Sequence, residues 1–131
     1  MNPVLAMRLK KDFPALFRPG ISCDILDGWE PILRRLCVDL QHEKDLAFTQ
    51  VKEKYGGLRV YTTWSTKQLE KRLEAAEAES FETCETCGKD GQMRTTRANS
   101  GDGWMFVACQ GCFDLAVAKG SAEPESEDSD S

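Results

Sequence analysis

The sequence predicts an α+β fold in which N-terminal helices and a β-hairpin are joined by a further helix to a small module that contains cysteines. Apolar residues at helical spacing, an alternating segment around a Gly-Gly pair and two C-x-x-C pairs near the C-terminus predict it. Residues 1–83 are expected to form the helical and hairpin domain, and residues 84–119 the cysteine module. Residues 120–131 are expected to be a disordered acidic tail.

Length and charge limit the classes of function. A chain of 131 residues, 40% of them apolar, can bury one modest core. The net charge is −5, and the five acids of residues 121–131 account for it, because residues 1–120 hold 17 basic and 17 acidic residues. A neutral folded part argues against a protein that holds nucleic acid mainly by bulk charge. Without a membrane-span pattern or a signal-peptide pattern, we expect a soluble, cytoplasmic protein with no membrane partner.

Two helices are expected before the hairpin. The first should span about residues 3–12, with Asn2 as its N-cap and a proline at its first position. The second has Asp27 and Glu30 at the spacing of a capping box, and it should run to about His42. Its apolar positions repeat at helical spacing and predict a buried face made of Trp29, Ile32, Leu33, Leu36 and Leu40.

Residues 46–64 are expected to form a β-hairpin whose turn is the glycine pair at 56–57. If Tyr55 pairs with Leu58, the two faces of the hairpin differ in character. Glu53 then falls on the apolar face, a defect that a bulge or a longer loop could correct. The apolar face consists of Val51, Tyr55, Leu58, Val60 and Trp64. The other face is basic and aromatic and consists of Lys52, Lys54, Arg59 and Tyr61.

A third helix is expected directly after the hairpin. Ser65 and Gln68 have the spacing of a capping box, and the helix should continue to about Glu82. It leads straight into Cys84. Charged residues surround a narrow apolar stripe formed by Leu69, Leu73 and Ala76.

Four of the six cysteines form the motifs C-E-T-C-G-K and C-Q-G-C, with a spacer of 21 residues between them. Zinc binds four thiolates in a tetrahedron, and each C-x-x-C turn can bring two sulfurs to one ion. The pattern therefore predicts one structural Zn²⁺ with no coordination position left for substrate water. Two disulfides, a redox dithiol and an iron–sulfur centre are the alternatives. The predicted ligands are Cys84, Cys87, Cys109 and Cys112.

The rest of the module supports a zinc-held fold. Gly88 suits a tight turn after the first cysteine pair. Residues 92–98 and 104–108 flank a turn-forming Asn-Ser-Gly-Asp-Gly segment and predict a second hairpin. A short helix should follow, with Cys112 in its first turn. This order of turn, hairpin and helix is typical of a treble clef or zinc ribbon.

Residues 51–61, Val-Lys-Glu-Lys-Tyr-Gly-Gly-Leu-Arg-Val-Tyr, resemble a phrase found in small zinc-ribbon proteins encoded by phages and prophages. In those proteins, as here, the phrase follows an amphipathic helix that contains tryptophan. A charged helix ending in C-x-x-C-G and a second cysteine pair come after it. The resemblance extends over about residues 24–115. It implies a phage origin, zinc binding and a bacterial host cell, and it implies no particular reaction.

The sequence offers few catalytic patterns. His42 is the single histidine, so no H-E-x-x-H pair exists, and near a helix end it is expected to face solvent. A zinc deaminase signature fails because Lys44 and Ala108 stand where it needs Glu and Pro. Cys23 or Cys37 could act as a nucleophile with His42 as its base, but Cys37 lies beside the apolar stripe, where buried cysteine is common. We therefore expect a protein without enzymatic activity.

Three classes of function are left open. The favoured one is a phage protein that binds and modulates a host protein, such as a defence or transcription component. A nucleic-acid-binding module is the second class and a small enzyme the third. An ordinary solvated strand face would explain the same charges. The candidate partner surface combines the outer hairpin face with two arginines of the cysteine module: Lys52, Lys54, Arg59, Tyr61, Arg94 and Arg97.

Overall fold

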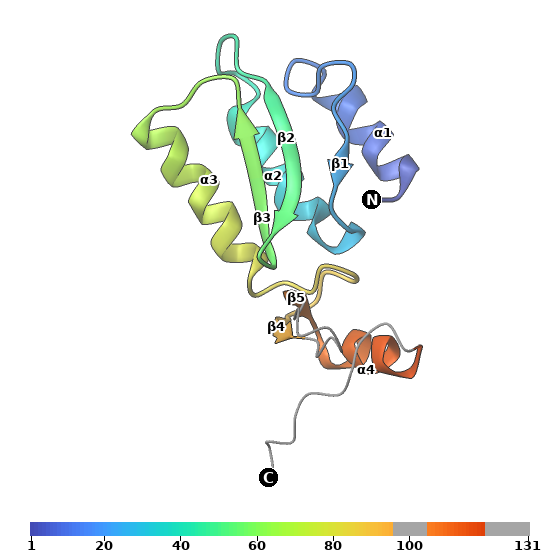
Figure 1. The fold of residues 1–131 in the computed structure, drawn as a ribbon. Coiled ribbons are helices and arrows are strands. Elements are labelled where there is room, and N and C mark those ends of the chain that lie inside the picture. Colours follow the sequence, from blue (N-terminus) through green and yellow to red (C-terminus); the bar gives the residue numbers. More distant parts are fainter. Residues whose placement is uncertain (96–104, 120–131) are drawn as a thin grey trace.

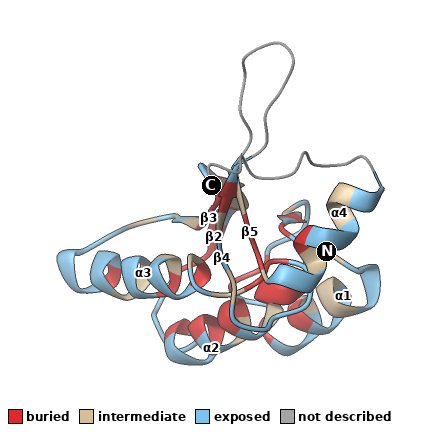
Figure 2. Ribbon diagram, turned by 90° about the horizontal axis from the view of Figure 1, so that it is seen from below, coloured by how far each residue is buried: buried red, intermediate tan, exposed pale blue. Residues whose placement is uncertain are grey.

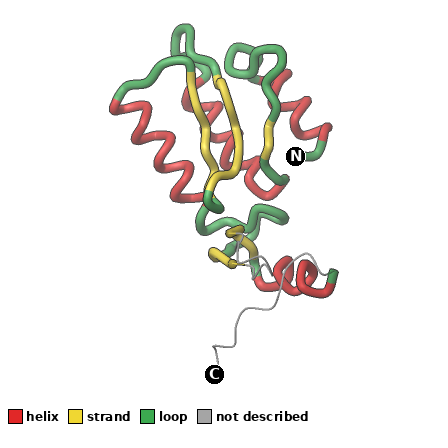
Figure 3. Tube along the Cα trace, in the orientation of Figure 1, coloured by secondary structure: helices red, strands yellow, loops and turns green. Residues whose placement is uncertain are grey.

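The computed structural model describes residues 1–95 and 105–119, and it has the mixed α+β architecture that the sequence predicts. Arg97 and the predicted acidic tail lie outside these residues. Figures 1 and 3 show the order of the elements along the chain. They are α1 (Pro3–Asp12), β1 (Cys23–Asp24), the 3₁₀ helix η1 (Asp27–Trp29), α2 (Glu30–Leu40), β2 (Phe48–Lys54), β3 (Gly57–Thr62), α3 (Lys67–Ser80), β4 (Gln92–Thr95), β5 (Met105–Ala108) and α4 (Gln110–Ala118).

A three-stranded sheet is the centre of the larger part. Its strand order is β1-β2-β3, with β1 parallel to β2 and β2 antiparallel to β3. Helix α2 crosses behind this sheet, α3 runs beside β3 and α1 lies beyond β1 (Figure 1). The β4–β5 ribbon and α4 lie at the end of the sheet where the β2–β3 turn is found. Within the described ranges, no helix has both the length and the apolar character that a membrane crossing requires.

The core lies between the helices and the sheet, and Figure 2 shows buried positions concentrated on α2 and the strands. The apolar face predicted for the second helix is confirmed over η1 and α2, because each of its five residues is at most 5% exposed. The rings of Phe17 and Phe48 meet edge to face with centroids 5.2 Å apart. Val107 of β5 belongs to the same core. A second, smaller cluster within the cysteine module contains Cys84, Ala108 and Phe113.

The first helix begins as predicted. The side chain of Asn2 accepts a hydrogen bond from the backbone N–H of Val4 at 2.8 Å, and α1 ends at Asp12. Asp27, the predicted cap of the second helix, has another role. Its carboxylate accepts a hydrogen bond from the backbone N–H of Asn2 at 2.6 Å, which ties the start of the chain to the η1 turn.

The predicted capping box of the second helix is therefore wrong. The turn of η1 precedes α2, and no side chain caps the backbone N–H groups at the start of α2. Glu30 instead pairs with Arg34 one turn later, with 3.0 Å between Oε2 and Nε. The helix ends at Leu40, two residues before the predicted end at His42.

The hairpin turn is one residue earlier than predicted. Lys54 pairs with Gly57, so Tyr55 and Gly56 form the two-residue turn with φ angles of 53° and 82°. Gly57 serves a different purpose. A Cβ at this position would lie 2.6 Å from the ring of Phe81, so the second glycine lets that ring approach the strand.

The predicted pairing of Tyr55 with Leu58 is wrong, because Leu58 pairs with Glu53. Both partners change by one position, so the strand residues that share each face stay the same, while Tyr55 now lies in the turn. Glu53 stays on the buried face, and the irregularity of the ladder lies between Phe48 and Gln50, too far away to correct it. The alternation predicted for the outer face is confirmed for Lys52, Lys54, Arg59 and Tyr61.

Helix α3 starts one residue later than predicted. The Thr66 hydroxyl accepts a hydrogen bond from the N–H of Leu69 at 3.1 Å, so Thr66 is the N-cap. Ser65 donates to the carboxylate of Glu70 at 2.9 Å, and the proposed box with Gln68 is wrong. The apolar stripe is confirmed, with two buried residues and one half-buried one: Leu69, Ala76 and Leu73.

Ser80 joins the end of α3 to the hairpin. It is fully buried, and its hydroxyl oxygen accepts a hydrogen bond from the N–H of Leu58 at 2.9 Å. The hydroxyl donates to the carbonyl of Glu77 at 2.6 Å. The helix ends at this residue, before the predicted end at Glu82.

We expect Ser80→Ala to lower the free energy of unfolding by about 1–3 kcal/mol, because the buried N–H of Leu58 would lose its acceptor. Ser65→Ala is the matched control at an exposed position and should change it by less than about 0.5 kcal/mol. Urea denaturation of the two variants measures both values. Equal effects would show that the Ser80 hydrogen bond contributes nothing specific.

Candidate metal centre

The four paired cysteines come together in space although two segments supply them. Cys84 and Cys87 lie in the loop between α3 and β4, while Cys109 and Cys112 lie at the start of α4. Their four Sγ atoms are within 4.8 Å of one another. The cysteines are therefore close enough to coordinate a metal ion, and the arrangement is consistent with one zinc ion.

The first cysteine pair lies in a tight turn that the backbone closes. The N–H of Gly88 donates to the carbonyl of Cys84 at 2.9 Å, and Gly88 adopts a φ of 83°. This left-handed conformation favours glycine, as the sequence suggested. The N–H of Cys84 donates to the carbonyl of Lys89 at 2.7 Å, which closes the loop from the other side.

The second pair is held by the start of a helix. Cys109 follows β5 and is the N-cap of α4, where its Sγ accepts a hydrogen bond from the N–H of Cys112 at 3.4 Å. Strands β4 and β5 pair antiparallel between the two cysteine turns. The predicted order of turn, hairpin and helix is present in the described residues, while the loop of this second hairpin, residues 96–104, lies outside them.

The spacing of the sulfurs is consistent with one zinc ion, and all four cysteines are free of disulfides in this structure. The Sγ atoms of Cys87 and Cys109 are 3.6 Å apart, well beyond the S–S bond of about 2.05 Å. A tetrahedron with Zn–S bonds of about 2.3 Å places its sulfurs about 3.8 Å apart. Four thiolates are also the ligand set that structural zinc sites use most readily.

The pKa shifts of the cysteine thiols also favour a bound cation. Burial opposes ionisation of Cys84, but backbone N–H groups, with Cys109 first, bring the pKa of Cys84 down to about 6. The N–H of Cys112 lowers the pKa of Cys109. Burial and then the neighbouring cysteines raise the pKa of Cys112. The cluster thus favours some thiolates and disfavours a full set of four, unless a cation compensates their repulsion.

The cysteine turn is attached directly to the start of the second helix. The N–H of Gly28 donates to the carbonyl of Glu85 at 2.8 Å, and the indole N–H of Trp29 donates to the carbonyl of Thr83 at 2.9 Å. A Cβ on Gly28 would lie 2.1 Å from the carbonyl oxygen of Cys84. The two backbones therefore touch, and only glycine permits this approach.

The neighbouring acid Glu85 accounts for the position of Glu53 on the apolar face of the hairpin. It is 5% exposed, and its carboxyl group accepts a hydrogen bond from the N–H of Val107 at 3.1 Å. The carboxyl of Glu53 on β2 lies near it, and the two groups influence each other's pKa across the boundary with the cysteine module. Burial raises the pKa of Glu85 to about 8, so one carboxyl of this pair carries a proton near neutral pH and can donate to the other.

Arg94 lies inside the cysteine module. It is 4% exposed, and its Nε donates to the carbonyl of Ala108 at 3.3 Å. Its guanidinium carbon lies 4.8 Å from the centre of the Phe113 ring. The arginine thus stabilises the β4–β5 ribbon against α4, and it is not displayed on the surface as a partner residue would be.

The basic hairpin residues differ in the contacts that their side chains make. The Nζ of Lys52 lies 6.0 Å from the ring centre of Tyr61, and the Nζ of Lys54 lies 5.8 Å from that of Tyr55. The Nε of Arg59 is 2.9 Å from Oε2 of Glu77 on α3, so this arginine is paired within the protein. Tyr55 and Tyr61 are exposed by 71% and 36%. Tyr55 belongs to this surface, although the sequence had assigned it to the apolar face.

The residues considered for catalysis lie apart from the cysteine cluster. Cys23 and Cys37 are buried in the main core, and burial raises the pKa of Cys37 to about 12. That thiol stays protonated near neutral pH, which makes it a poor nucleophile. His42 is exposed after the end of α2.

Comparisons with protein-family models, with curated proteins and with solved structures find no match to this chain.

Metal analysis should find close to one zinc ion per wild-type chain and far less in Cys84→Ser or Cys109→Ser protein, with unfolding of the cysteine module. A structural zinc ion contributes on the order of 10 kcal/mol to the folding of small modules. Cys23→Ser and Cys37→Ser are the matched controls and should keep the ion, because both thiols lie in the other core cluster. Loss of zinc from either control would mean that the ligand set is wrong.

Gly28→Ala should destabilise the protein by at least about 1–3 kcal/mol and speed the release of zinc to a chelator. The added Cβ would push the carbonyl of Cys84 away from the η1 turn. Gly111→Ala adds the same methyl group to α4 at a position with open space around it, and it should leave both quantities unchanged or improved. Wild-type stability and zinc release in the Gly28 variant would show that the two backbones do not meet.

Proposed function

We propose that this chain is a non-enzymatic binding protein of phage type whose C-terminal module is held by one structural zinc ion. The observation that carries the proposal is the closed set of four thiols, which leaves no ligand position for a substrate or an activated water. The turn, the β4–β5 ribbon and α4 follow one another in the order of a treble clef or zinc ribbon, and this supports such a module.

The outer face of the β2–β3 hairpin is the proposed partner surface. It presents two pairs in which a lysine lies near a tyrosine ring, Lys52 with Tyr61 and Lys54 with Tyr55. Tyrosine is enriched in protein interfaces because it buries much area with little loss of side-chain entropy. Arg59 is left out of this surface because it is paired with Glu77.

The proposed partner is a host protein with an acidic surface, such as a defence or transcription component. The two lysines favour an acidic patch, and the resemblance to phage-encoded proteins favours a partner from the bacterial host. Nucleic acid is the alternative, because lysines interleaved with tyrosines also suit stacked bases and phosphates. The balance of 17 basic and 17 acidic residues in positions 1–120 weighs against it.

Replacing Lys52 and Lys54 with alanine should leave folding and zinc content unchanged, because both side chains project from the outer face. Capture of the host protein from a bacterial lysate should fall by about tenfold, because both lysine charges of the proposed partner surface are lost together. The control is Lys67→Ala with Lys71→Ala, which removes the same charge from exposed positions of α3.

Treating the lysate with nuclease separates the two kinds of partner. Capture that survives the treatment supports a protein partner, whereas capture that disappears supports nucleic acid. Under the nucleic-acid alternative, the double variant should also bind with a shallower salt dependence. Undiminished capture by a folded double variant would remove the hairpin from the partner surface.

A further inference from the structure

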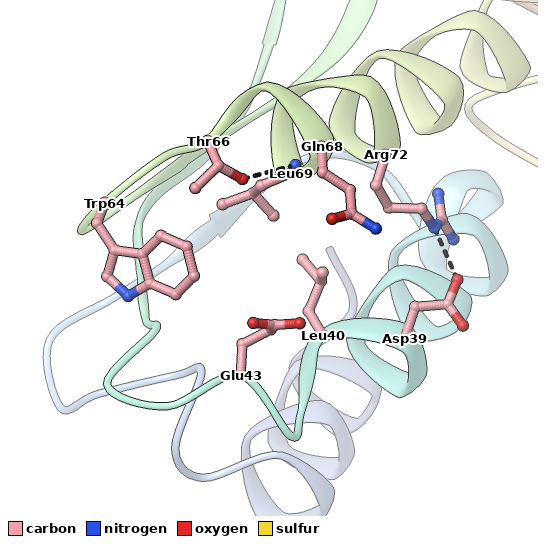
Figure 4. A pocket seen from close by; sticks show the side chains of 8 residues that line it. All are labelled: Asp39, Leu40, Glu43, Trp64, Thr66, Gln68, Leu69 and Arg72. Atoms are coloured by element: carbon pink, nitrogen blue, oxygen red, sulfur yellow. Dashed lines mark hydrogen bonds and ion pairs between the residues drawn. The ribbon is translucent and has the colours of Figure 1, made fainter.

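A groove of about 410 Å³ lies between the C-terminal end of α2 and the start of α3 (Figure 4). Its volume is within the range of about 300–1,000 Å³ that binding pockets have. It lies at the end of the sheet opposite to the β2–β3 turn, away from the proposed hairpin surface (Figure 1). The groove is therefore a separate site, and binding of a ligand there does not depend on the proposed function of the hairpin.

The walls of the groove combine apolar side chains with one large aromatic ring. Leu40 and Leu69 are each 5% exposed and supply the apolar wall. The half-buried Trp64 borders the groove with its ring turned towards the interior (Figure 4). Its indole N–H donates to the carbonyl of Lys44 at 3.3 Å, which limits rotation of the ring. The indole is thus held beside the groove, where a bound side chain can contact it.

The charges of the groove do not balance. Arg72 and Asp39 neutralise each other, with 2.7 Å between Nε and Oδ2. Glu43 is exposed and has no such partner, since its carboxylate makes no hydrogen bond or ion pair with any other described residue. Figure 4 shows this carboxylate pointing into the groove, opposite the amide of Gln68. Two acids and one base leave the lining with a charge of −1.

We infer that this groove receives an arginine side chain from a segment of a partner protein. The aliphatic stem of an arginine would lie on Leu40 and Leu69. Its guanidinium would stack on the Trp64 ring and form a charge-assisted, bidentate hydrogen bond with the Glu43 carboxylate. An acidic side chain would be repelled by Glu43, and an apolar one would desolvate that carboxylate without compensation. Arginine is preferred to lysine because only a planar guanidinium can both stack and bind bidentately.

The test titrates the full-length, zinc-loaded protein, labelled with ¹⁵N, with the blocked peptide acetyl-Gly-Gly-Arg-Gly-Gly-amide. Saturable shifts are expected at the Trp64 indole N–H and at the backbone amides of Glu43 and Gln68. The same peptide with citrulline in place of arginine keeps the shape and removes the charge, and it should give no saturable shift. Glu43→Gln should weaken arginine binding by roughly threefold to tenfold, the loss expected for a partly exposed charged hydrogen bond.

Two control variants make the outcome decisive. Glu74→Gln removes an exposed carboxylate of α3 outside the groove and should bind the arginine peptide like the wild type. The Lys52→Ala, Lys54→Ala protein should also bind it normally, so a failure of the hairpin proposal and a failure of this one are distinguishable. The inference is overturned if the arginine peptide causes no saturable shift at millimolar concentration, or if citrulline or lysine peptides bind as well. It is equally overturned if Glu43→Gln binds like the wild type.

Discussion

The contact between the first cysteine turn and the start of the second helix is the constraint on which the rest of the structure depends. Gly28 brings its backbone against Cys84 and Glu85, and the neighbouring indole of Trp29 reaches the carbonyl of Thr83. Trp29 is itself fully buried in the main core. A single short segment therefore anchors both the helix that covers the sheet and the loop that supplies two of the four thiols.

This contact couples the cysteine module to the larger part of the protein. Val107 of β5 lies in the main core, and the buried acid Glu85 connects the backbone of Val107 to Glu53 of the hairpin. Burying two carboxyl groups together is unfavourable unless they share a proton, and the raised pKa of Glu85 meets that condition. A metal ion that holds the cysteine turn in place would therefore also stabilise the contact between Glu85 and the hairpin.

The two proposed binding surfaces use different ends of the same sheet. The hairpin face is basic and aromatic, whereas the groove between α2 and α3 has an aromatic wall and one unpaired acid. Helix α3 runs between them, with Ser80 fixing its C-terminal end to Leu58 and Trp64 preceding its N-terminal end. The protein can therefore present two surfaces of opposite charge preference on different elements of one fold.

The sequence by itself determined the grouping of the four paired cysteines, the apolar face of the second helix and the two faces of the hairpin strands. Each of these depends on residue type and local spacing, and the faces of a strand survive a register error because side chains alternate with a period of two. Tertiary structure decided the roles of Asp27, Gly57 and Glu53. Asp27 binds the chain start instead of capping a helix, Gly57 admits the ring of Phe81, and Glu53 meets Glu85. These partners lie more than twenty residues away along the chain, so no local pattern could identify them.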